Sequence, residues 1–297
     1  MSNAQYILGP MRLPFLILTP ACVLLGLASA SWTEGAVDWL HFALILVGAI
    51  AAHVSVNALN EYFDFKSGLD MKTRRTPFSG GSGVLPANPE KAPVALATGL
   101  AAMAITGAIG VFFLVNQGLI LLPLGLLGIL LVYTYTIWLT RSAFLCLIAP
   151  GLGFGICMVM GTDLALTGAY SWTAFVVALV PFFLVNNLLL INQFPDVDAD
   201  RSIGRRHLPI LAGRRTSAVV YGAFLISTYL AVVVGVVLKL LPLLALLGLA
   251  TLFLAIPNIA AAYRHADEIE KLIPYLARNV MITIATPVLV AVGILIA

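Results

Sequence analysis

The chain has 297 residues, of which 61% are hydrophobic and only 10% are charged. Soluble domains are roughly one quarter charged, so this composition excludes an ordinary soluble domain and predicts a protein that crosses a lipid bilayer several times. The formal net charge of +3 says little until the charges are placed along the chain, and we expect no nucleic-acid partner.

Long apolar runs predict the transmembrane helices, because a helix needs roughly 20 apolar residues to cross ~30 Å of hydrocarbon. Nine such runs cover about residues 13–31, 40–62, 94–115, 119–139, 143–161, 172–194, 217–238, 241–262 and 275–296. We therefore expect an all-α bundle of nine transmembrane helices that forms one membrane-embedded domain over residues 1–297. No basic segment precedes the first run and no cleavage site follows it, so we expect that run to be retained as a helix.

Basic residues predict how the helices are oriented, because the connections between nine spans alternate between the two sides of a membrane. One side receives Arg12, Arg141 and the loops at 63–93, 195–216 and 263–274. With Arg278 near the start of the last run, this side holds fifteen of the sixteen Lys and Arg residues, and the other side holds only Lys239. Since basic residues stay cytoplasmic, we expect the N-terminus and these loops in the cytoplasm and the C-terminus outside, in an inner or plasma membrane.

Two acidic stretches stand at the ends of apolar runs. Residues 60–70 read NEYFDFKSGLD, and residues 192–200 read NQFPDVDAD. Each begins with Asn, has Asp four residues later and ends in a further Asp, which suggests two pseudo-repeated halves. Both preceding helices run toward the cytoplasm, so both stretches are expected on one face of the membrane. Carboxylates at a helix C-terminus are unfavourable unless cations offset their charge. The two stretches are therefore interpreted either as a cation-binding site or as ordinary solvated loops.

Spacing predicts which side chains of the first stretch share a surface. Asn60 and Asp64 are four residues apart and therefore share a helix face. Asp70 can rejoin this face only if the chain turns, and Gly68 is a suitable place for the helix to stop.

In the second stretch, Asp196 and Asp200 are also four residues apart, whereas Asp198 is expected to point elsewhere. Further polar residues lie deeper in the same two helices, at His53, Asn57, Asn186 and Asn187. Polar side chains at bilayer depth must point into the bundle. We expect His53 to be a packed polar residue rather than a direct participant in chemistry.

These residue types suit a metal–diphosphate site. Carboxylate and amide oxygens without a nearby thiol favour a hard cation, and Mg²⁺ is commonly held by one or two carboxylates together with substrate phosphates. Lys and Arg residues alternate with Asp in both loops and would neutralise phosphate oxygens. The combination favours the departure of diphosphate from an allylic diphosphate, with the isoprenoid tail enclosed by the apolar bundle.

The two stretches resemble the paired Asp-rich motifs of the UbiA superfamily of intramembrane prenyltransferases. Arg12-Leu13-Pro14 resembles the start of the family's first helix, residues 133–141 (YTYTIWLTR) its Tyr-rich end of helix 4, and residues 205–208 (RRHL) its basic segment after the second motif. NEYFDFKSGLD is most similar to the 1,4-dihydroxy-2-naphthoate polyprenyltransferases of menaquinone synthesis. The chain departs from that group at Glu61, where Asp is frequent, and at Ala143-Phe144, where many members have Gly-Glu.

The resemblance implies a Mg²⁺-dependent transfer of a polyprenyl group from an allylic polyprenyl diphosphate to an aromatic acceptor. It implies that Mg²⁺ and the diphosphate are held by Asn60, Asp64, Asp70, Asn192, Asp196 and Asp200. Contacts to phosphate oxygens are expected from Lys66, Arg74 and Arg141, with Arg12 either assisting them or anchoring the first helix at the membrane surface.

The same resemblance suggests roles in the reaction itself. Asp64, Asp196 and Asp200 would act catalytically, and a carboxylate of the second stretch would remove the proton from the alkylated ring. Tyr135 would face the allylic cation or lie as an aromatic residue at the membrane interface. We expect His207 to belong to a loop, and residues 77–83 (PFSGGSG) to form a lid, an anion-binding turn or a plain loop.

Two alternatives stay open from the sequence. The same site would serve another acceptor, such as 4-hydroxybenzoate, homogentisate, a chlorophyllide, haem or geranylgeranylglyceryl phosphate. A cation-coupled transporter also uses repeats and intramembrane acids, although its sites lie near the bilayer midplane rather than at one face. Release of diphosphate would distinguish the enzyme from the transporter. The oligomeric state is left open.

Overall fold

The computed structural model describes residues 3–73, 75–76 and 80–297, which form helices and short connections without a strand. Eight helices in these ranges are long and apolar enough to cross a membrane: Leu13–Glu34, Trp39–Lys66, Pro89–Gln117, Ala143–Thr167, Trp172–Asn192, Arg214–Val237, Leu243–Arg264 and Ile269–Leu295. A further apolar helix, Leu119–Thr134, is shorter. The prediction of an all-α membrane protein is confirmed, while the count of nine spans stays a prediction.

The α-helices are α1 (Asn3–Met11), α2 (Leu18–Glu34), α3 (Trp39–Lys66), α4 (Val84–Ala87), α5 (Ala92–Gln117), α6 (Leu122–Thr134), α7 (Ala143–Gly151), α8 (Gly161–Thr167), α9 (Trp172–Asn192), α10 (Val197–Ser202), α11 (Leu208–Leu211), α12 (Arg214–Val237), α13 (Leu252–Arg264) and α14 (Ile269–Leu295). A π-helical segment, Leu152–Met160, joins α7 to α8 in one continuous span. Four 3-10 segments lead directly into α2, α5, α6 and α13: Leu13–Ile17, Pro89–Lys91, Leu119–Leu121 and Leu243–Thr251.

Short polar residues determine where two of the spans begin. The Asp38 carboxylate accepts hydrogen bonds from the backbone N–H groups of Leu40 and His41 at the start of α3. The Ser171 hydroxyl accepts one from the N–H of Ala174 at the start of α9. Such caps satisfy donors that have no partner within the helix, which matters at a membrane surface where the helix must leave an aqueous layer.

Helix α9 is the most deeply buried of the eight candidate spans. It packs against α12 and against the π-helical segment. A Cβ atom on Gly151 would lie 2.3 Å from the carbonyl oxygen of Phe182, and one on Gly155 would lie 2.5 Å from that of Ala178. Only glycine permits so close an approach of two backbones, which is a common device for packing membrane helices. This contact holds the second acidic stretch, which follows α9, in a defined place.

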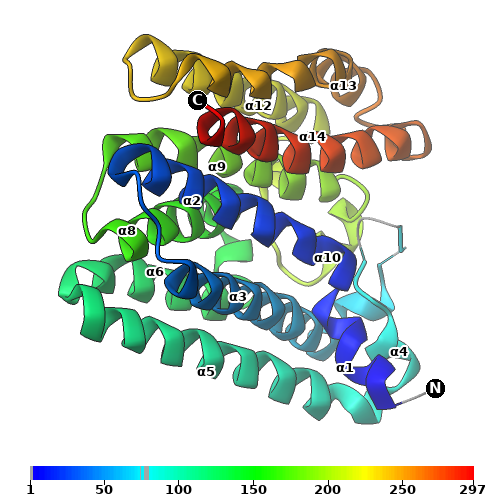
Figure 1. Ribbon diagram of the computed structural model, residues 1–297. Helices are drawn as coiled ribbons and strands as arrows, with labels where there is room; N and C mark the ends of the chain where they lie inside the picture. Colours follow the sequence, from blue (N-terminus) through cyan, green and yellow to red (C-terminus); the bar gives the residue numbers. More distant parts are fainter. Residues whose placement is uncertain (1–2, 74, 77–79) are drawn as a thin grey trace.

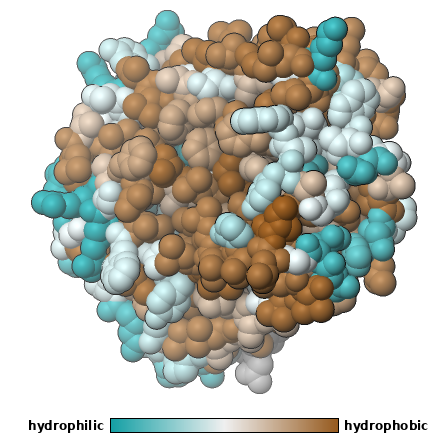
Figure 2. Space-filling model, turned by 90° about the vertical axis from the view of Figure 1, so that its left-hand side faces the viewer, coloured by the Kyte–Doolittle hydropathy of each residue, from teal (hydrophilic) through white to brown (hydrophobic). Residues whose placement is uncertain are grey.

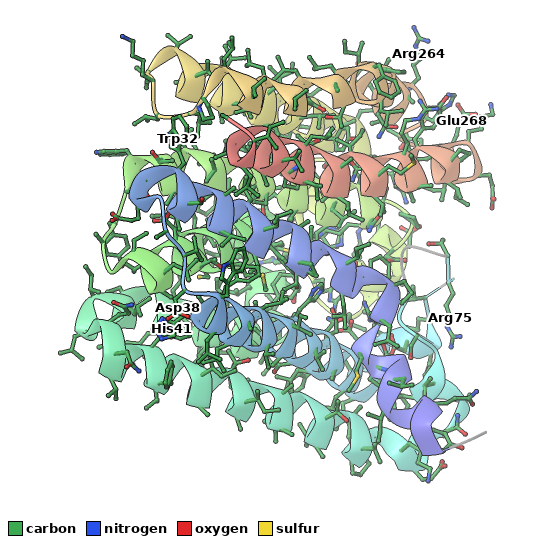
Figure 3. The ribbon with its side chains drawn as sticks, viewed as in Figure 1. Trp32, Asp38, His41, Arg75, Arg264 and Glu268 are labelled. Carbon is green, nitrogen blue, oxygen red and sulfur yellow. The ribbon has the colours of Figure 1, made fainter. Side chains whose placement is uncertain are left out.

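The loops that carry the acidic stretches share one end of the bundle. In Figure 1 the helices run roughly side by side, with α2 between α3 and α14, and with α1, α4 and α10 gathered at the end where the N-terminus lies. The C-terminus lies at the opposite end. Figure 3 shows Arg75, Arg264 and Glu268 at the N-terminal end and Trp32 and Asp38 at the other.

The opposite end has a different character. Figure 2 shows it as a mostly apolar face, with hydrophilic side chains mainly around its rim. Trp39 and Trp172, which begin α3 and α9 at this end, are 68% and 73% exposed. Tryptophan is enriched where a membrane meets water, so this end is suited to the second bilayer surface.

The fourth predicted span, 119–139, is shorter than expected. Its helix ends at Thr134, and turns at residues 135–138 lead to the 3-10 turn Leu139–Arg141. Residues 133–138 (YTYTIW) are all aromatic or β-branched, and such residues are weaker helix formers than the leucines before them. Hydropathy does not measure helix propensity, so the predicted apolar run is longer than the helix.

Candidate active site

The first acidic stretch has the geometry that its spacing predicted. Helix α3 continues past Asn60 and Asp64 to Lys66, and Gly68 follows with a φ of 76°, a backbone conformation that glycine adopts without strain. The turn Leu69–Met71 then brings Asp70 back against the bundle, where it is 8% exposed. Asp64 is 7% exposed, so both carboxylates are withdrawn from solvent.

Glu61 joins three separate segments of the site. Its carboxylate is fully buried and accepts a hydrogen bond from Arg12 Nη2 at 3.0 Å. The same Nη2 lies 3.1 Å from Asn60 Oδ1. On the other side, the Glu61 carboxylate accepts hydrogen bonds from the backbone N–H of Ser82 at 3.0 Å and from the Ser82 hydroxyl. Glu61 therefore holds Arg12, α3 and the segment before α4 together, a role that the sequence analysis did not predict.

The second acidic stretch begins where α9 ends. Asn192 is the last residue of α9, Asp196 directly precedes α10, and the backbone N–H of Asp200 donates to the carbonyl oxygen of Asp196 at 2.9 Å. Asp200 is 2% exposed, whereas the side chain of Asp198 is 87% exposed. The prediction that Asp198 points away from its two neighbours is confirmed.

Arg205 connects the two stretches. Its Nη1 donates to Asp200 Oδ1 at 2.8 Å, and its Nη2 donates to Asp64 Oδ1. The imidazole Nε2 of His207 lies 2.7 Å from the other Asp200 oxygen, Oδ2. Burial acts against the charge of the guanidinium, but the two carboxylates outweigh it and raise the pKa of Arg205 above its ordinary value. Two segments 141 residues apart in sequence thus meet at one buried guanidinium.

Asp70 lies in a strongly acidic environment. Burial, together with repulsion from Asp64 and Glu61, raises the pKa of Asp70 to about 7. Among the residues that the structure describes, neither the buried Oδ2 atom of Asp70 nor Oδ1 of Asn192 has a hydrogen-bond partner. Buried oxygens without partners are costly, and hard oxygen donors of this kind suit Mg²⁺.

The residues therefore fit a magnesium ion by their chemistry, although they are not assembled around one. Over the ranges that the structure describes, no three His, Cys, Asp or Glu side chains are gathered as a ready-made metal site. Instead, the guanidinium of Arg205 contacts both Asp64 and Asp200, and that of Arg12 contacts Glu61.

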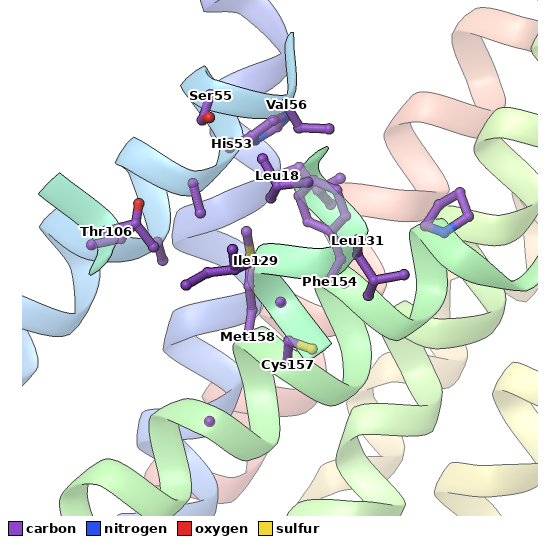
Figure 4. Close-up of a pocket in the computed structure, with 18 of the residues that line it drawn as sticks. Leu18, His53, Ser55, Val56, Thr106, Ile129, Leu131, Phe154, Cys157 and Met158 are labelled. Carbon is purple, nitrogen blue, oxygen red and sulfur yellow. The ribbon is translucent and has the colours of Figure 1, made fainter. Parts of the chain in front are cut away.

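A large apolar cavity of about 580 Å³ begins beside these residues. Its polar end is lined by Arg12, Asn60, Tyr135 and Asn192, and its walls come from α2, α3, α5, α6, the π-helical segment, α9 and α14. Figure 4 shows part of the lining, with apolar side chains such as Leu18, Ile129, Leu131, Phe154 and Met158. The side chains that line the cavity are mostly apolar. The cavity extends to Leu122 and Ala165 near the opposite end of the bundle.

His53 and Asn57 both line this cavity, as their position on α3 predicted. The Nδ1 atom of His53 lies 2.8 Å from the hydroxyl of Thr19, and its ring meets that of Phe154 edge to face at 4.8 Å. The expectation that His53 is a packed polar residue is confirmed (Figure 4). Asn57 Nδ2 donates to the carbonyl oxygen of Met11 at 3.0 Å.

Tyr135 lies where the cavity meets the acidic stretches. It lines the cavity, and it lies close to the thiol of Cys146. Gln193 Nε2 in turn donates to the Cys146 sulfur at 3.3 Å. Tyr135 also interacts electrostatically with Arg205. This chain of contacts fixes the aromatic ring beside the second stretch.

The predicted basic contacts are placed less centrally. Lys66 is exposed, with its ammonium 5.8 Å from the centre of the Tyr62 ring, and Arg141 is also exposed. The backbone N–H of Arg206 donates to the carbonyl oxygen of Thr140 at 3.0 Å, which brings the turn that contains Arg141 beside the 205–207 segment. Arg74 and residues 77–79 of the predicted glycine-rich turn lie outside the described residues.

Sequence reasoning did not single out Arg205, His207 or Ser82 as site residues. It placed Arg205 and His207 only within a basic segment and Ser82 only within a candidate lid or anion-binding turn. The expectation that His207 belongs to a loop is confirmed, because residues 205–207 form the connection before α11. Within this loop the His207 side chain is 1% exposed and contacts Asp200. One signal was available: Arg205 and His207 follow Asp200 closely, with Gly204 between, so the chain can turn back on the carboxylate.

Known proteins share this sequence pattern. The sequence model of the UbiA prenyltransferase family matches residues 19–279 of this chain. The chain belongs to this family. A 1,4-dihydroxy-2-naphthoate octaprenyltransferase from Bacillus subtilis is 28% identical over 199 residues, which cover 66% of this chain and 63% of that relative. A protoheme IX farnesyltransferase from a Synechococcus species is 30% identical over 202 residues, which cover 67% of this chain and 57% of that protein.

Solved structures of UbiA homologues share the fold. The apo structure of a homologue from Aeropyrum pernix has a TM-score of 0.74 at 19% identity and covers 95% of this chain and 98% of its own. A homologue from Archaeoglobus fulgidus bound to DMAPP and Mg²⁺ has a TM-score of 0.56 at 14% identity and covers 93% and 98%. At these identities the likeness concerns the UbiA fold alone.

Proposed function

We propose that the protein transfers a polyprenyl group from an allylic polyprenyl diphosphate to an aromatic acceptor with release of diphosphate, in a Mg²⁺-dependent reaction. One observation carries this proposal. Two acidic stretches far apart in sequence meet at Arg205, beside the polar end of a long apolar cavity. Such a site offers oxygen donors and guanidinium groups for a metal–diphosphate and a dry compartment for an isoprenoid tail.

In this proposal Mg²⁺ would be held by Asn60, Asp64, Asp70, Asn192, Asp196 and Asp200. When bound, it would stabilise the negative charge of the departing diphosphate. The homologue bound to DMAPP and Mg²⁺ supports magnesium as the metal. The buried oxygens of Asp70 and Asn192, which have no hydrogen-bond partner among the described residues, support the choice of these two ligands.

The chain's own residues would do the rest. Arg12, which lines the cavity, and the outlying Lys66 and Arg141 would neutralise phosphate oxygens. The cavity would exclude water while the carbon–oxygen bond of the donor breaks and its electron pair leaves with the diphosphate. Tyr135 would present its ring to the allylic cation. The acceptor ring would then attack, and a carboxylate of the second stretch would take the proton released.

We propose 1,4-dihydroxy-2-naphthoate as the acceptor, in menaquinone biosynthesis. The Bacillus relative and the resemblance of residues 60–70 support this choice. The reaction would also require loss of the naphthoate carboxyl group as CO₂, with a proton taking its place on the ring. Because the farnesyltransferase relative acts on protohaem by its name, haem is a second candidate acceptor.

We also propose nine spans, with Leu119–Thr134 as the fourth, and a site that faces the cytoplasm. Alternation of nine spans is consistent with the N-terminus and the C-terminus at opposite ends of the bundle in Figure 1. The basic residues of the acidic end support its cytoplasmic placement. The two pseudo-repeated halves would each contribute one acidic stretch.

One experiment tests the choice of acceptor. Purified protein is incubated with Mg²⁺, a mixed set of polyprenyl diphosphates and several aromatic acceptors, and the products are identified by mass. Prenylated, decarboxylated naphthoate is the expected product. Prenylation of haem alone would transfer the proposal to the second acceptor, and the absence of any prenylated product would reject it.

A further inference from the structure

The position of Arg205 conflicts with a simple role as a phosphate ligand. Its two terminal nitrogens donate to Asp64 and Asp200, the carboxylates that the proposed function assigns to the metal. The side chain of Arg205 is only 14% exposed, and those of Asp64 and Asp200 are 10% and 3% exposed. The guanidinium therefore lies where a cation between the two stretches would be required.

The charges explain why a guanidinium is suited to this place. Asp64 experiences the negative charges of both Asp200 and Glu61, and Arg205 is the larger of the two basic influences on it. Without a bound cation these buried carboxylates would repel one another, at a cost that rises as water is excluded. One guanidinium that spans both of them removes this repulsion and holds the ends of α3 and α10 together.

His207 fixes the position of the Asp200 carboxylate. Its imidazole Nε2 contacts Asp200 Oδ2, while Arg205 donates a hydrogen bond to Oδ1 of the same carboxylate. Among the hydrogen bonds of the described residues, Asp64 has no second side-chain donor that corresponds to His207 on Asp200. The contact between Arg205 and Asp64 can therefore open without disturbing Asp200.

We propose that Arg205 is an internal counter-ion that occupies the place of the metal in the ligand-free protein and moves onto the diphosphate when the metal–diphosphate binds. This inference rests on the proposed function, because it needs a diphosphate to receive the guanidinium. A guanidinium fork fits phosphate oxygens as well as carboxylate oxygens, so the exchange keeps its hydrogen bonds. Arg205 then makes Mg²⁺ binding without diphosphate weak and couples the two ligands.

Calorimetric titration with Mg²⁺ alone tests the inference on purified wild type, Arg205→Gln and Arg206→Gln. Arg206 is an exposed neighbour that contacts Thr140 through its backbone N–H, so it serves as the matched control. We expect Arg205→Gln to bind Mg²⁺ at least tenfold more tightly than wild type, and Arg206→Gln to match wild type. Titration of inorganic diphosphate at saturating Mg²⁺ should then show at least tenfold weaker binding by Arg205→Gln.

An Arg205→Gln protein that binds Mg²⁺ no more tightly than wild type overturns the inference, as does one that keeps wild-type affinity for diphosphate. If Arg205→Gln does not fold, Arg205→Lys decides: it keeps the charge but loses the two-pronged contact, and its Mg²⁺ affinity should rise by a smaller factor. No rise rejects the inference. Failure of the proposed function is distinguishable, because it would abolish prenyl transfer by wild type while leaving the Mg²⁺ result as expected.

Discussion

The two acidic stretches have nearly the same sequence spacing but different local structures. Asn60 and Asp64 lie within α3, which continues to Lys66, whereas α9 ends at Asn192 and the chain turns before α10 carries Asp200. Their supports differ as well. The first stretch is held by Arg12 and by Ser82 through Glu61, and the second by Arg205 and His207 through Asp200.

This difference shows that a repeated motif need not produce a symmetrical site. The first stretch supplies a rigid helical wall, and the second supplies a turn that reaches across to it. Arg205 is the contact through which the two become one site. Four sets of substitutions test whether the two stretches act together and whether their supports matter equally.

The largest effect is expected from neutralising one carboxylate in either stretch. Asp64→Asn and Asp196→Asn should each lower prenyl transfer by at least about 10³-fold, equivalent to about 4 kcal/mol of transition-state stabilisation, because each weakens the hold on the metal–diphosphate. Initial rates of product formation in vesicles provide the measurement. Asp198→Asn, on an exposed side chain, is the control and should stay within about twofold. Full activity of both Asn variants would reject the site.

The support of the first stretch is tested by Glu61→Ala. This change leaves the Arg12 guanidinium and the Ser82 N–H without their buried partner, so it should destabilise the protein by about 2 kcal/mol. A lower midpoint of thermal unfolding in detergent would show this. Glu61→Asp, which keeps the charge on a shorter side chain, should recover part of the loss. An unchanged midpoint for Glu61→Ala would mean that the contact contributes nothing to stability.

The support of the second stretch is tested by His207→Ala. Removal of the imidazole from Asp200 Oδ2 loses one hydrogen bond to a carboxylate, so prenyl transfer should fall about tenfold, or about 1.4 kcal/mol. The fall should appear in kcat/KM for the diphosphate. His265→Ala, at a partly exposed histidine outside the site, is the control. Equal effects of the two substitutions would remove His207 from the site.

The smallest effect is expected from Lys66→Gln at the exposed end of α3. An exposed cation contributes about 0.2–1 kcal/mol to an ion pair, so KM for the polyprenyl diphosphate should rise no more than about fivefold. The effect should also diminish in high salt. A loss comparable to that of Asp64→Asn would mean that Lys66 moves much closer to the phosphates than its position over Tyr62 indicates.

The sequence predicted most of the helices because apolar length and charge placement are local properties. It also predicted that Gly68 would return Asp70 to the site and that Asp198 would point away. Three features were beyond its reach. The end of α6 at Thr134 depends on helix propensity within an apolar run, and the contacts of Arg205 with Asp64 and of Glu61 with Ser82 form only in the folded chain.

The central claim is that the two stretches together release diphosphate from an allylic polyprenyl diphosphate. The direct measurement follows diphosphate release and prenyl product in parallel, with 1,4-dihydroxy-2-naphthoate as acceptor, with Mg²⁺ and again after chelation. We predict equal amounts of diphosphate and product with Mg²⁺ and neither after chelation. Absence of diphosphate release in the presence of Mg²⁺ and acceptor, or release that is the same after chelation, would contradict the account.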